Sequence, residues 1–302
     1  MTRLGLVIEA NRCIGCNVCV MACKDEFVGN DYLPLSAAQP DTTYGFGPSN
    51  TYGWPNTPSS SALWLKPGHS WMNDTQMILG KFPRVKTAYV AQPCMHCASA
   101  PCQKAAANNA VYTRADGIVI IDPVKSVGQK QIMSACPYGR IYWNESLNIP
   151  QKCTLCAHLV DQGKNPKCVD VCPYSAIHFG DLSDPNSDVS KFVSANATEA
   201  LHPEYGTNPN VFYVGLPKPF LSGKVVSGKT GEYIGGAQVQ LSSSDGTTAT
   251  TSTDNYADFE FKDLRAGVVY MLQVSAAGMY PKKLVVYLDK AKDVGKVPLS
   301  PS

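Results

Sequence analysis

Twelve cysteines are the residues of this sequence whose type and spacing could do chemistry. All of them lie between Cys13 and Cys172. The apolar stretch at the N-terminus is too short for a secretory signal, and no small-residue cleavage site follows it. Without an export signal, cysteines at this density indicate metal binding or redox chemistry rather than disulfide bonds.

The outer cysteines form two ferredoxin-type runs, Cys13-x2-Cys16-x2-Cys19-x3-Cys23 and Cys153-x2-Cys156-x11-Cys168-x3-Cys172-Pro173. In bacterial ferredoxins, the first three thiolates of a run hold one cluster, and the fourth binds the other cluster of the pair. Crossing the runs predicts cluster 1 on Cys13, Cys16, Cys19 and Cys172. Cluster 2 is then predicted on Cys153, Cys156, Cys168 and Cys23.

The four inner cysteines predict cluster 3 on Cys94, Cys97, Cys102 and Cys136. A partner cluster of this inner pair would need four more cysteines, at the positions of Ala106, Ser126, Gln129 and Ile132. Because all four ligands of one cluster are absent while all four of the other are present, the sequence predicts three clusters. The ferredoxin spacing favours [4Fe–4S] clusters. A three-iron form, structural zinc and disulfides are the alternatives.

Several polar residues flank the predicted ligands. His96 and His158 could be mistaken for ligands, but the cysteines already complete each cluster. We expect both rings to form hydrogen bonds near a sulfur or to the backbone. Lys24, Arg140 and Lys152 could raise a cluster potential through their charge, or could be solvated or contact a partner.

The elements that must position these cysteines predict an α+β fold over residues 1–182. Strand-like runs at 5–9 and 117–122 alternate with short helical pieces after the cysteine runs. This pattern predicts two ferredoxin-like modules, with the inner one (about 84–150) nested in the outer one. The loops have little other core to bury, so metal binding and folding should be coupled.

Residues 30–92 interrupt this domain with a segment that is rich in Pro, Gly and Ser and also in aromatic residues, which argues against plain disorder. So long a loop is unusual unless it is functional. Aromatic residues are enriched in interface cores, so contact with a partner is expected, and a self-packed excursion is the alternative. The aromatic residues are Tyr32, Tyr44, Phe46, Tyr52, Trp54, Trp64, Trp71 and Phe82.

The C-terminal part changes character. Residues 183–219 are polar and irregular, which predicts a linker. Residues 220–302 contain short alternating β-runs separated by glycine turns, which predicts a β-sandwich, with a small barrel as the alternative. This tail resembles the carboxypeptidase-regulatory and transthyretin-like domains, and it carries no clustered acid, base or nucleophile. Packing against another subunit is therefore its expected role.

Composition excludes other classes. A net charge of +2 with 17% charged residues offers no basic surface for nucleic acid. No window approaches the ~18 apolar residues that span a membrane. A cytoplasmic location is expected by default, and export on a twin-arginine signal carried by a partner is the alternative.

Taken together, the cysteine motifs resemble those of the electron-transfer subunits of the molybdopterin oxidoreductase (dimethyl sulfoxide reductase) superfamily. Most members have four clusters, whereas this sequence predicts three. The three-cluster pattern and the β-tail are similar to the small subunits of the pyrogallol–phloroglucinol transhydroxylases, phenol hydroxylases and catechol dehydroxylases. The motifs that carry the resemblance are those around Cys13, Cys94, Cys102, Cys136 and Cys153, together with the segments 68–73 and 142–145.

The resemblance implies a large partner subunit that holds molybdenum on two pterin guanine dinucleotides and acts on a polyphenolic ring. It also implies that this chain has no catalytic residue, that it forms a heterodimer or a multimer of heterodimers, and that cluster 1 faces the partner. A free-standing polyferredoxin shuttle and a cluster-stabilised structural subunit are the alternative functions. The external electron donor or acceptor and the direction of electron flow are left open.

Overall fold

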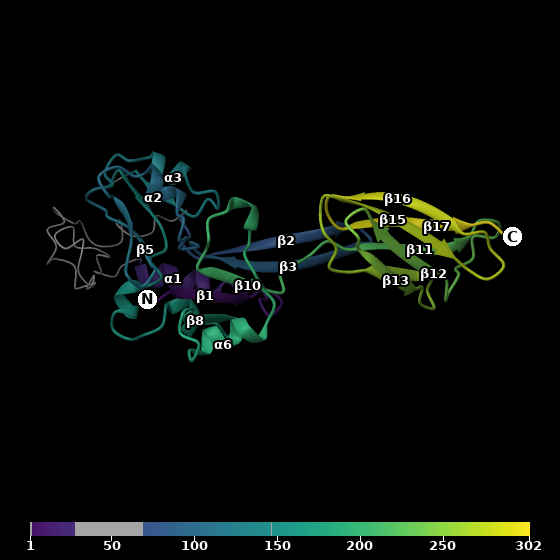
Figure 1. The fold of residues 1–302 in the computed structure, drawn as a ribbon, viewed down its shortest axis with the longest axis horizontal. Coiled ribbons are helices and arrows are strands. Elements are labelled where there is room, and N and C mark those ends of the chain that lie inside the picture. The colour runs from purple at the N-terminus through teal and green to yellow at the C-terminus, as the bar shows by residue number, and fades with distance from the viewer. Residues whose placement is uncertain (1, 28–68, 146) are drawn as a thin grey trace. The chain divides into compact units, whose positions relative to one another are not determined.

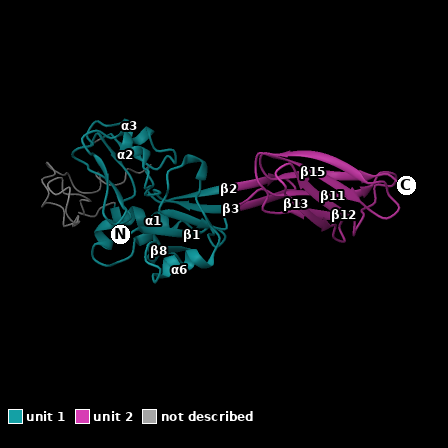
Figure 2. Ribbon diagram, in the orientation of Figure 1, with its two compact units in different colours: residues 1–76, 89–216 teal, residues 77–88, 217–302 magenta. Residues whose placement is uncertain are grey.

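The computed structural model describes residues 2–27, 69–145 and 147–302. The chain divides into two compact units (Figures 1 and 2). Unit 1 comprises Met1–Gln76 and Tyr89–Leu216, and unit 2 comprises Met77–Ala88 and Pro217–Ser302. No helix among the described residues is long and apolar enough to cross a membrane.

The largest sheet of unit 1 has four strands in the order β8-β1-β10-β9 (Figure 1). Strand β1 is antiparallel to β8 and parallel to β10. Its apolar run is fully buried, with no exposed surface on Leu6, Val7 or Ile8, as expected for a central strand covered on both faces. The strands are β1 (Leu4–Glu9), β8 (Ile177–Asp181), β9 (Thr198–Glu199) and β10 (Val211–Val214).

Short helices and two-stranded sheets make up the rest of unit 1, as the α+β prediction requires. The helices are α1 (Val18–Phe27), α2 (Pro101–Ala105), α3 (Gln131–Ser134), α4 (Ala157–Val160), α5 (Lys167–Asp170), α6 (Asp188–Ala195) and η3 (Pro203–Tyr205). The paired strands are β2 (Asn73–Lys81) with β3 (Arg84–Gln92), β4 (Val111–Thr113) with β5 (Val119–Ile121), and β6 (Tyr142–Asn144) with β7 (Ile149–Gln151). The adjoining ends of β2 and β3 belong to unit 2.

The segment 183–219 differs from the predicted linker. It contains α6, β9, η3 and β10, and unit 1 includes it as far as Leu216. Strand β10 lies inside the main sheet, and alternate residues of this strand, Val211 and Tyr213, have no exposed surface. The polar composition that suggested a linker belongs to the turns and to α6, where Ser187 caps the helix by accepting a hydrogen bond from Ser190 N.

Most of the predicted aromatic insertion at 30–92 lies in 28–68, outside the described residues. In the described remainder, residues 73–92 form β2 and β3 rather than an irregular loop. Trp71 is buried against Phe27, with ring centroids 4.7 Å apart. Phe82, in the turn between the strands, is 92% exposed.

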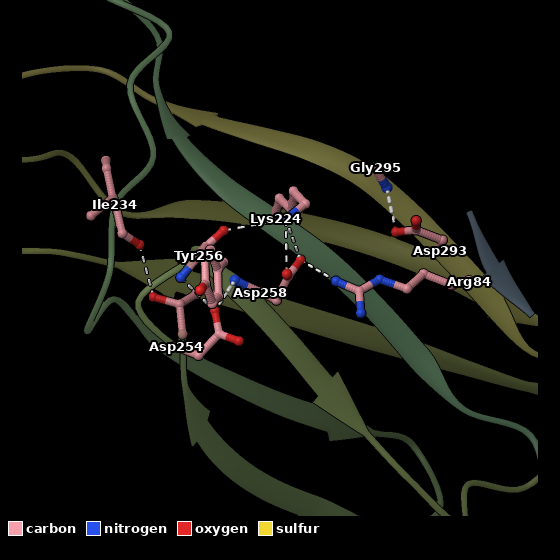
Figure 3. Close-up of polar contacts among 9 residues, drawn as sticks. Arg84, Lys224, Ile234, Asp254, Tyr256, Asp258, Asp293 and Gly295 are labelled. Atoms are coloured by element: carbon pink, nitrogen blue, oxygen red, sulfur yellow. Dashed lines mark hydrogen bonds and ion pairs between the residues drawn. The ribbon is translucent and has the colours of Figure 1, made fainter. Parts of the chain in front are cut away.

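Unit 2 is a β-sandwich, as predicted. Its sheets have the orders β14-β11-β17 and β13-β12-β15-β16, and inward apolar residues such as Val239, Phe259 and Leu272 form one core between them. On β11 and β14, Lys224 Nζ donates to Asp258 at 2.8 Å, and Arg84 pairs with the same carboxylate (Figure 3). The strands are β11 (Leu221–Ser227), β12 (Gln238–Ser243), β13 (Thr248–Ser252), β14 (Asp258–Phe261), β15 (Val268–Ser275), β16 (Lys282–Leu288) and β17 (Lys292–Leu299).

Candidate metal centres

The cysteines predicted for cluster 1 lie close enough to influence one another electrostatically. Burial, followed by the charges of neighbouring groups, raises the pKa of Cys19 to about 12. Those neighbours are Asp74, Cys13, Cys16 and Cys172. Segments more than 150 residues apart in sequence (Cys13 to Cys172) therefore meet at one place. The loop before α1, the first turn of α1 and the turn after α5 supply the thiols.

The cysteines predicted for cluster 2 also come together. Burial raises the pKa of the Cys168 thiol well above its ordinary value. The next influences on it are the charges of Cys156, Cys153 and Cys23. Helix α1 brings Cys23 to this group, while its Cys19, one turn earlier, belongs to the first. This position of Cys23 is compatible with the predicted crossing of the two runs.

The cysteines predicted for cluster 3 form the third group. Burial and then the charge of Cys94 raise the pKa of Cys97 to about 12, with smaller contributions from Cys102 and Cys136. A hydrogen bond from the hydroxyl of Thr207 acts in the opposite direction. Thr207 is itself buried, so this donor is built into the site.

Contacts between the groups give their order. Cys19 of the first group also raises the pKa of Cys23 and Cys168 in the second. Cys94 of the third group raises the pKa of Cys153 in the second, and its backbone N–H donates a hydrogen bond to the same sulfur. The second group therefore lies between the first and the third.

The first Cys-x-x-Cys turn of each cysteine run shares one backbone feature. In these turns, at Cys13, Cys94 and Cys153, the residue before the second cysteine has a positive φ: 70° at Gly15, 42° at His96 and 56° at Leu155. In this conformation the backbone N–H of that residue donates to the first sulfur, at 3.5 Å from His96 to Cys94 and 3.3 Å from Leu155 to Cys153. A left-handed conformation is costly for residues other than glycine and persists only where the surroundings enforce it.

A second repeated turn follows Cys136 and Cys172. Each is followed by Pro, Tyr and a residue with positive φ, Gly139 at 61° and Ser175 at 48°. The next N–H returns to the cysteine sulfur, at 3.5 Å from Arg140 and 3.3 Å from Ala176. The inner and outer cysteine runs therefore have the same local geometry, as expected of two related modules.

Groups of four thiols, most of them buried or half-buried and several accepting N–H donors, fit clusters of irons bound by thiolates. Thiolate ligation requires that the thiols lose their protons, which couples metal binding to pH and folding. A zinc site would require convergence on a single ion. Among the described residues, no three His, Cys, Asp or Glu side chains are placed to hold one.

The positions that lack cysteines are filled by other contacts. The Gln129 side chain accepts from Ala107 N at 2.8 Å and donates to Lys125 O at 2.7 Å. Ile132 is fully buried, and the buried hydroxyl of Ser126 has no hydrogen-bond partner among the described residues. An amide and an aliphatic side chain thus occupy the region where a fourth cluster was predicted to be missing.

The rings of the two histidines beside the cysteines have different partners: His96 contacts the backbone, as expected, whereas His158 contacts a carboxylate. Nδ1 of His96 accepts the Val119 N–H at 3.1 Å. Nε2 of His158 lies 2.6 Å from a carboxylate oxygen of buried Glu26. Burial lowers the pKa of both rings, with Lys152 adding to the effect on His96 and Glu26 opposing it on His158.

Three residues near the cysteines were not predicted from the sequence. Thr207 donates to Cys97, the backbone N–H of Met72 donates to Cys23, and Asp74 has the largest charge influence on Cys13 and Cys19. Each is distant in sequence from the cysteine it influences. Their spacing from the cysteines does not signal them, because the contacts arise from β2, the residue before it and the segment before β10.

Two family descriptions match this chain. A "4Fe-4S dicluster domain" matches residues 85–182, and a "carboxypeptidase regulatory-like domain" matches residues 221–297. The small subunit of pyrogallol hydroxytransferase from Pelobacter acidigallici is 35% identical over 99% of this chain and 100% of its own length. The chain belongs to the iron–sulfur electron-transfer subunits of the molybdopterin oxidoreductases.

Other relatives of this iron–sulfur subunit family cover the cysteine-containing part. A sulfite dehydrogenase subunit from Allochromatium vinosum is 33% identical over 71% of this chain and 83% of its own length. The iron–sulfur subunit of the arsenate respiratory reductase of Shewanella sp. (strain ANA-3) is 28% identical over 70% and 96%. This subunit therefore transfers electrons through iron–sulfur chemistry as part of a larger oxidoreductase.

Proposed function

We propose that this subunit holds three [4Fe–4S] clusters and exchanges electrons with a molybdenum bis-pterin guanine dinucleotide centre in a large partner subunit. The predicted ligands are Cys13, Cys16, Cys19 and Cys172 for cluster 1, Cys23, Cys153, Cys156 and Cys168 for cluster 2, and Cys94, Cys97, Cys102 and Cys136 for cluster 3. The observation that supports the proposal is that Cys19, Cys168 and Cys97 are each influenced by the charges of the three other thiols of their predicted set.

The repeated N–H donors support two ferredoxin modules, the inner one nested in the outer one. When bound, the clusters would supply one-electron transfer, and the chain would tune it through N–H donors, burial and charge. The contacts between groups support a linear order of clusters 1, 2 and 3. Electrons would then pass along the chain in single steps.

The partner would bind over cluster 1. Its cysteines line a cavity with Ile14 and Tyr174 at the rim, and exposed apolar side chains lie on α1 nearby. Ile14, Val18, Met21 and Tyr174 are 51, 39, 65 and 46% exposed. Apolar side chains around a redox site favour a close, dry interface with the protein that exchanges the electron. The cytoplasm stays the expected location, with export beside the partner as the alternative.

The full-length similarity to a pyrogallol hydroxytransferase small subunit supports a polyphenolic substrate for the complex. We propose a transhydroxylase, a hydroxylase or a catechol dehydroxylase. The substrate pocket would lie in the partner, so this subunit does not distinguish these reactions. Assays of the purified complex with pyrogallol, resorcinol and catechol would separate them by their products.

Metal analysis of the native complex, purified without oxygen, tests the proposal. We expect about twelve irons for each copy of this chain, four for each of three clusters, with one molybdenum in a co-purifying large subunit. Twelve irons without molybdenum or a partner would instead favour the polyferredoxin alternative. Clusters that are never reduced during turnover would favour the structural alternative.

A further inference from the structure

Lys152 is a buried cation beside the proposed clusters. It is 3% exposed, and its ammonium donates to the carbonyl oxygens of Val119 and Cys153. In the part of the chain that the structure describes, no carboxylate pairs with it. An isolated ammonium is costly to bury unless an anion compensates it, so its location requires negative charge nearby.

Lys152 acts on cysteine sulfurs from two of the groups. Its charge lowers the pKa of Cys102 and Cys136 in the third group, and that of Cys153 in the second, against the larger effect of burial. The ammonium thus lies between the proposed clusters 2 and 3. Clusters bound by four thiolates would supply the compensating negative charge.

Asp74 places the opposite charge at the first group. It lines the cavity that contains Cys13, Cys16, Cys19 and Cys172. Its charge is the largest from any neighbouring group on Cys13 and Cys19. Its buried Oδ1 has no hydrogen-bond partner among the described residues. The repulsion between this carboxylate and a thiolate-bound cluster would therefore be weakly compensated within the described chain.

We propose that Lys152 and Asp74 order the reduction potentials of the clusters, so that an electron on this subunit rests at the Lys152 end. One-electron reduction adds negative charge to a cluster. A nearby cation stabilises the reduced form and a nearby carboxylate destabilises it. Clusters 2 and 3 are raised in potential and cluster 1 is lowered. The inference rests on the ligand sets of the proposed function.

Redox titration of the native complex, followed by electron paramagnetic resonance, tests the ordering. In Lys152→Met, two clusters should shift to more negative potential. In Asp74→Asn, one different cluster should shift to more positive potential. Each potential should shift by about 59 mV, which for one electron changes the ratio of oxidised to reduced cluster about tenfold at a fixed ambient potential.

Matched controls are the exposed residues Lys104 and Asp170, which lie two positions from Cys102 and Cys172. Lys104→Met and Asp170→Asn should shift no potential by this amount.

The outcomes separate this ordering from the cluster assignment. If three clusters titrate but neither variant differs from its control, the ordering is wrong and the assignment survives. If fewer than three clusters titrate in the unsubstituted complex, the proposed function fails first.

Lys152→Arg keeps the positive charge and should keep the original potentials. Loss of iron from both Lys152→Met and Lys152→Gln would overturn the role of Lys152, because the side chain would then hold the fold. Loss of iron from Asp74→Asn would overturn the role of Asp74 in the same way.

Discussion

At the scale of single residues, the backbone beside the cysteines contributes to the candidate sites, because its N–H groups donate hydrogen bonds to the sulfurs. Three turns place an N–H toward a sulfur through a residue with positive φ, and only one of these residues is glycine. His96 and Leu155 adopt the same conformation at a steric cost. The fold therefore strains its backbone to supply donors to sulfur.

Gly15→Ala should remove cluster 1. A Cβ at this position would lie 2.4 Å from Cδ1 of Tyr89, and φ is +70°. The left-handed conformation alone costs about 1–2 kcal/mol, and the ring cannot be displaced without disturbing the turn. Iron analysis should show a loss of about four irons per chain.

Gly139→Ala is the matched control, because φ there is +61° but nothing lies within 4 Å of an added Cβ. It should retain all its iron and show only the backbone cost. Equal iron content in the two variants would contradict the steric argument.

Two substitutions at the positions that lack cysteines should have opposite effects on stability. Gln129→Ala removes hydrogen bonds to Ala107 and Lys125 and should cost about 1–2 kcal/mol. Ser126→Ala removes a buried hydroxyl that has no hydrogen-bond partner among the described residues and should be neutral or stabilising. The temperature at which the visible cluster absorbance bleaches, without oxygen, should fall for the first variant only. A fall for both would mean that Ser126 has a structural role.

At the scale of elements, the first residues of β3 contact β14 within unit 2 through charge pairs. Arg84 pairs with Asp258, and Lys86 pairs with Glu260. Lys86 also lies 4.5 Å from the ring centroid of Phe220. Individual pairs at the surface contribute little, but pairs that share a strand can act together.

Asp258 gives this contact a pH dependence. Partial burial acts to raise the pKa of its carboxyl, but hydrogen bonds from Lys224 and Arg84 bring it below the ordinary value. A lowered folded pKa gives stability that is present above the ordinary value of about 3.9 and is lost as pH falls through the folded value. Local protection of β11 and β14 should therefore decline in acid.

Hydrogen exchange of these strands, corrected for intrinsic rates, measures the effect. Asp258→Asn should exchange about fivefold faster near neutral pH, for a loss of about 1 kcal/mol, and should lose less protection than the unsubstituted chain on acidification. The exposed Asp263→Asn is the control and should behave like the unsubstituted chain. Protection in Asp258→Asn that falls as steeply in acid would refute the linkage.

At the scale of the whole molecule, the sequence predicted an iron–sulfur subunit because ligand spacing is set by cluster geometry, and the relatives confirm that family. It predicted the β-sandwich because apolar residues at alternate positions of a strand indicate that one face of the strand is buried. It did not predict β10, whose four residues are too few to show a period within a polar segment. Nor did it predict Asp74 or Thr207, because these reach the cysteines only through tertiary packing.

The partner interface can be tested on α1. Met21→Glu places a charge among the exposed apolar side chains of α1, near cluster 1. It should weaken association with the large subunit, at a cost of about 1–3 kcal/mol, while the chain keeps its iron. Val127→Glu alters a side chain that is also exposed, at 53% compared with 65% for Met21, but lies outside α1. It should leave association unchanged. Equal weakening in both variants would place the interface elsewhere.

The measurement that tests the central claim most directly is the iron content of the native complex with one serine substitution in each cysteine group. Cys16→Ser, Cys156→Ser and Cys136→Ser each remove one proposed ligand from a different cluster. The account predicts about twelve irons for the unsubstituted chain. It also predicts that each variant loses the spectroscopic signal of one cluster, or converts it to a three-iron form, while the other two signals persist. Two variants that affect the same signal, or one that affects none, would contradict the three ligand sets.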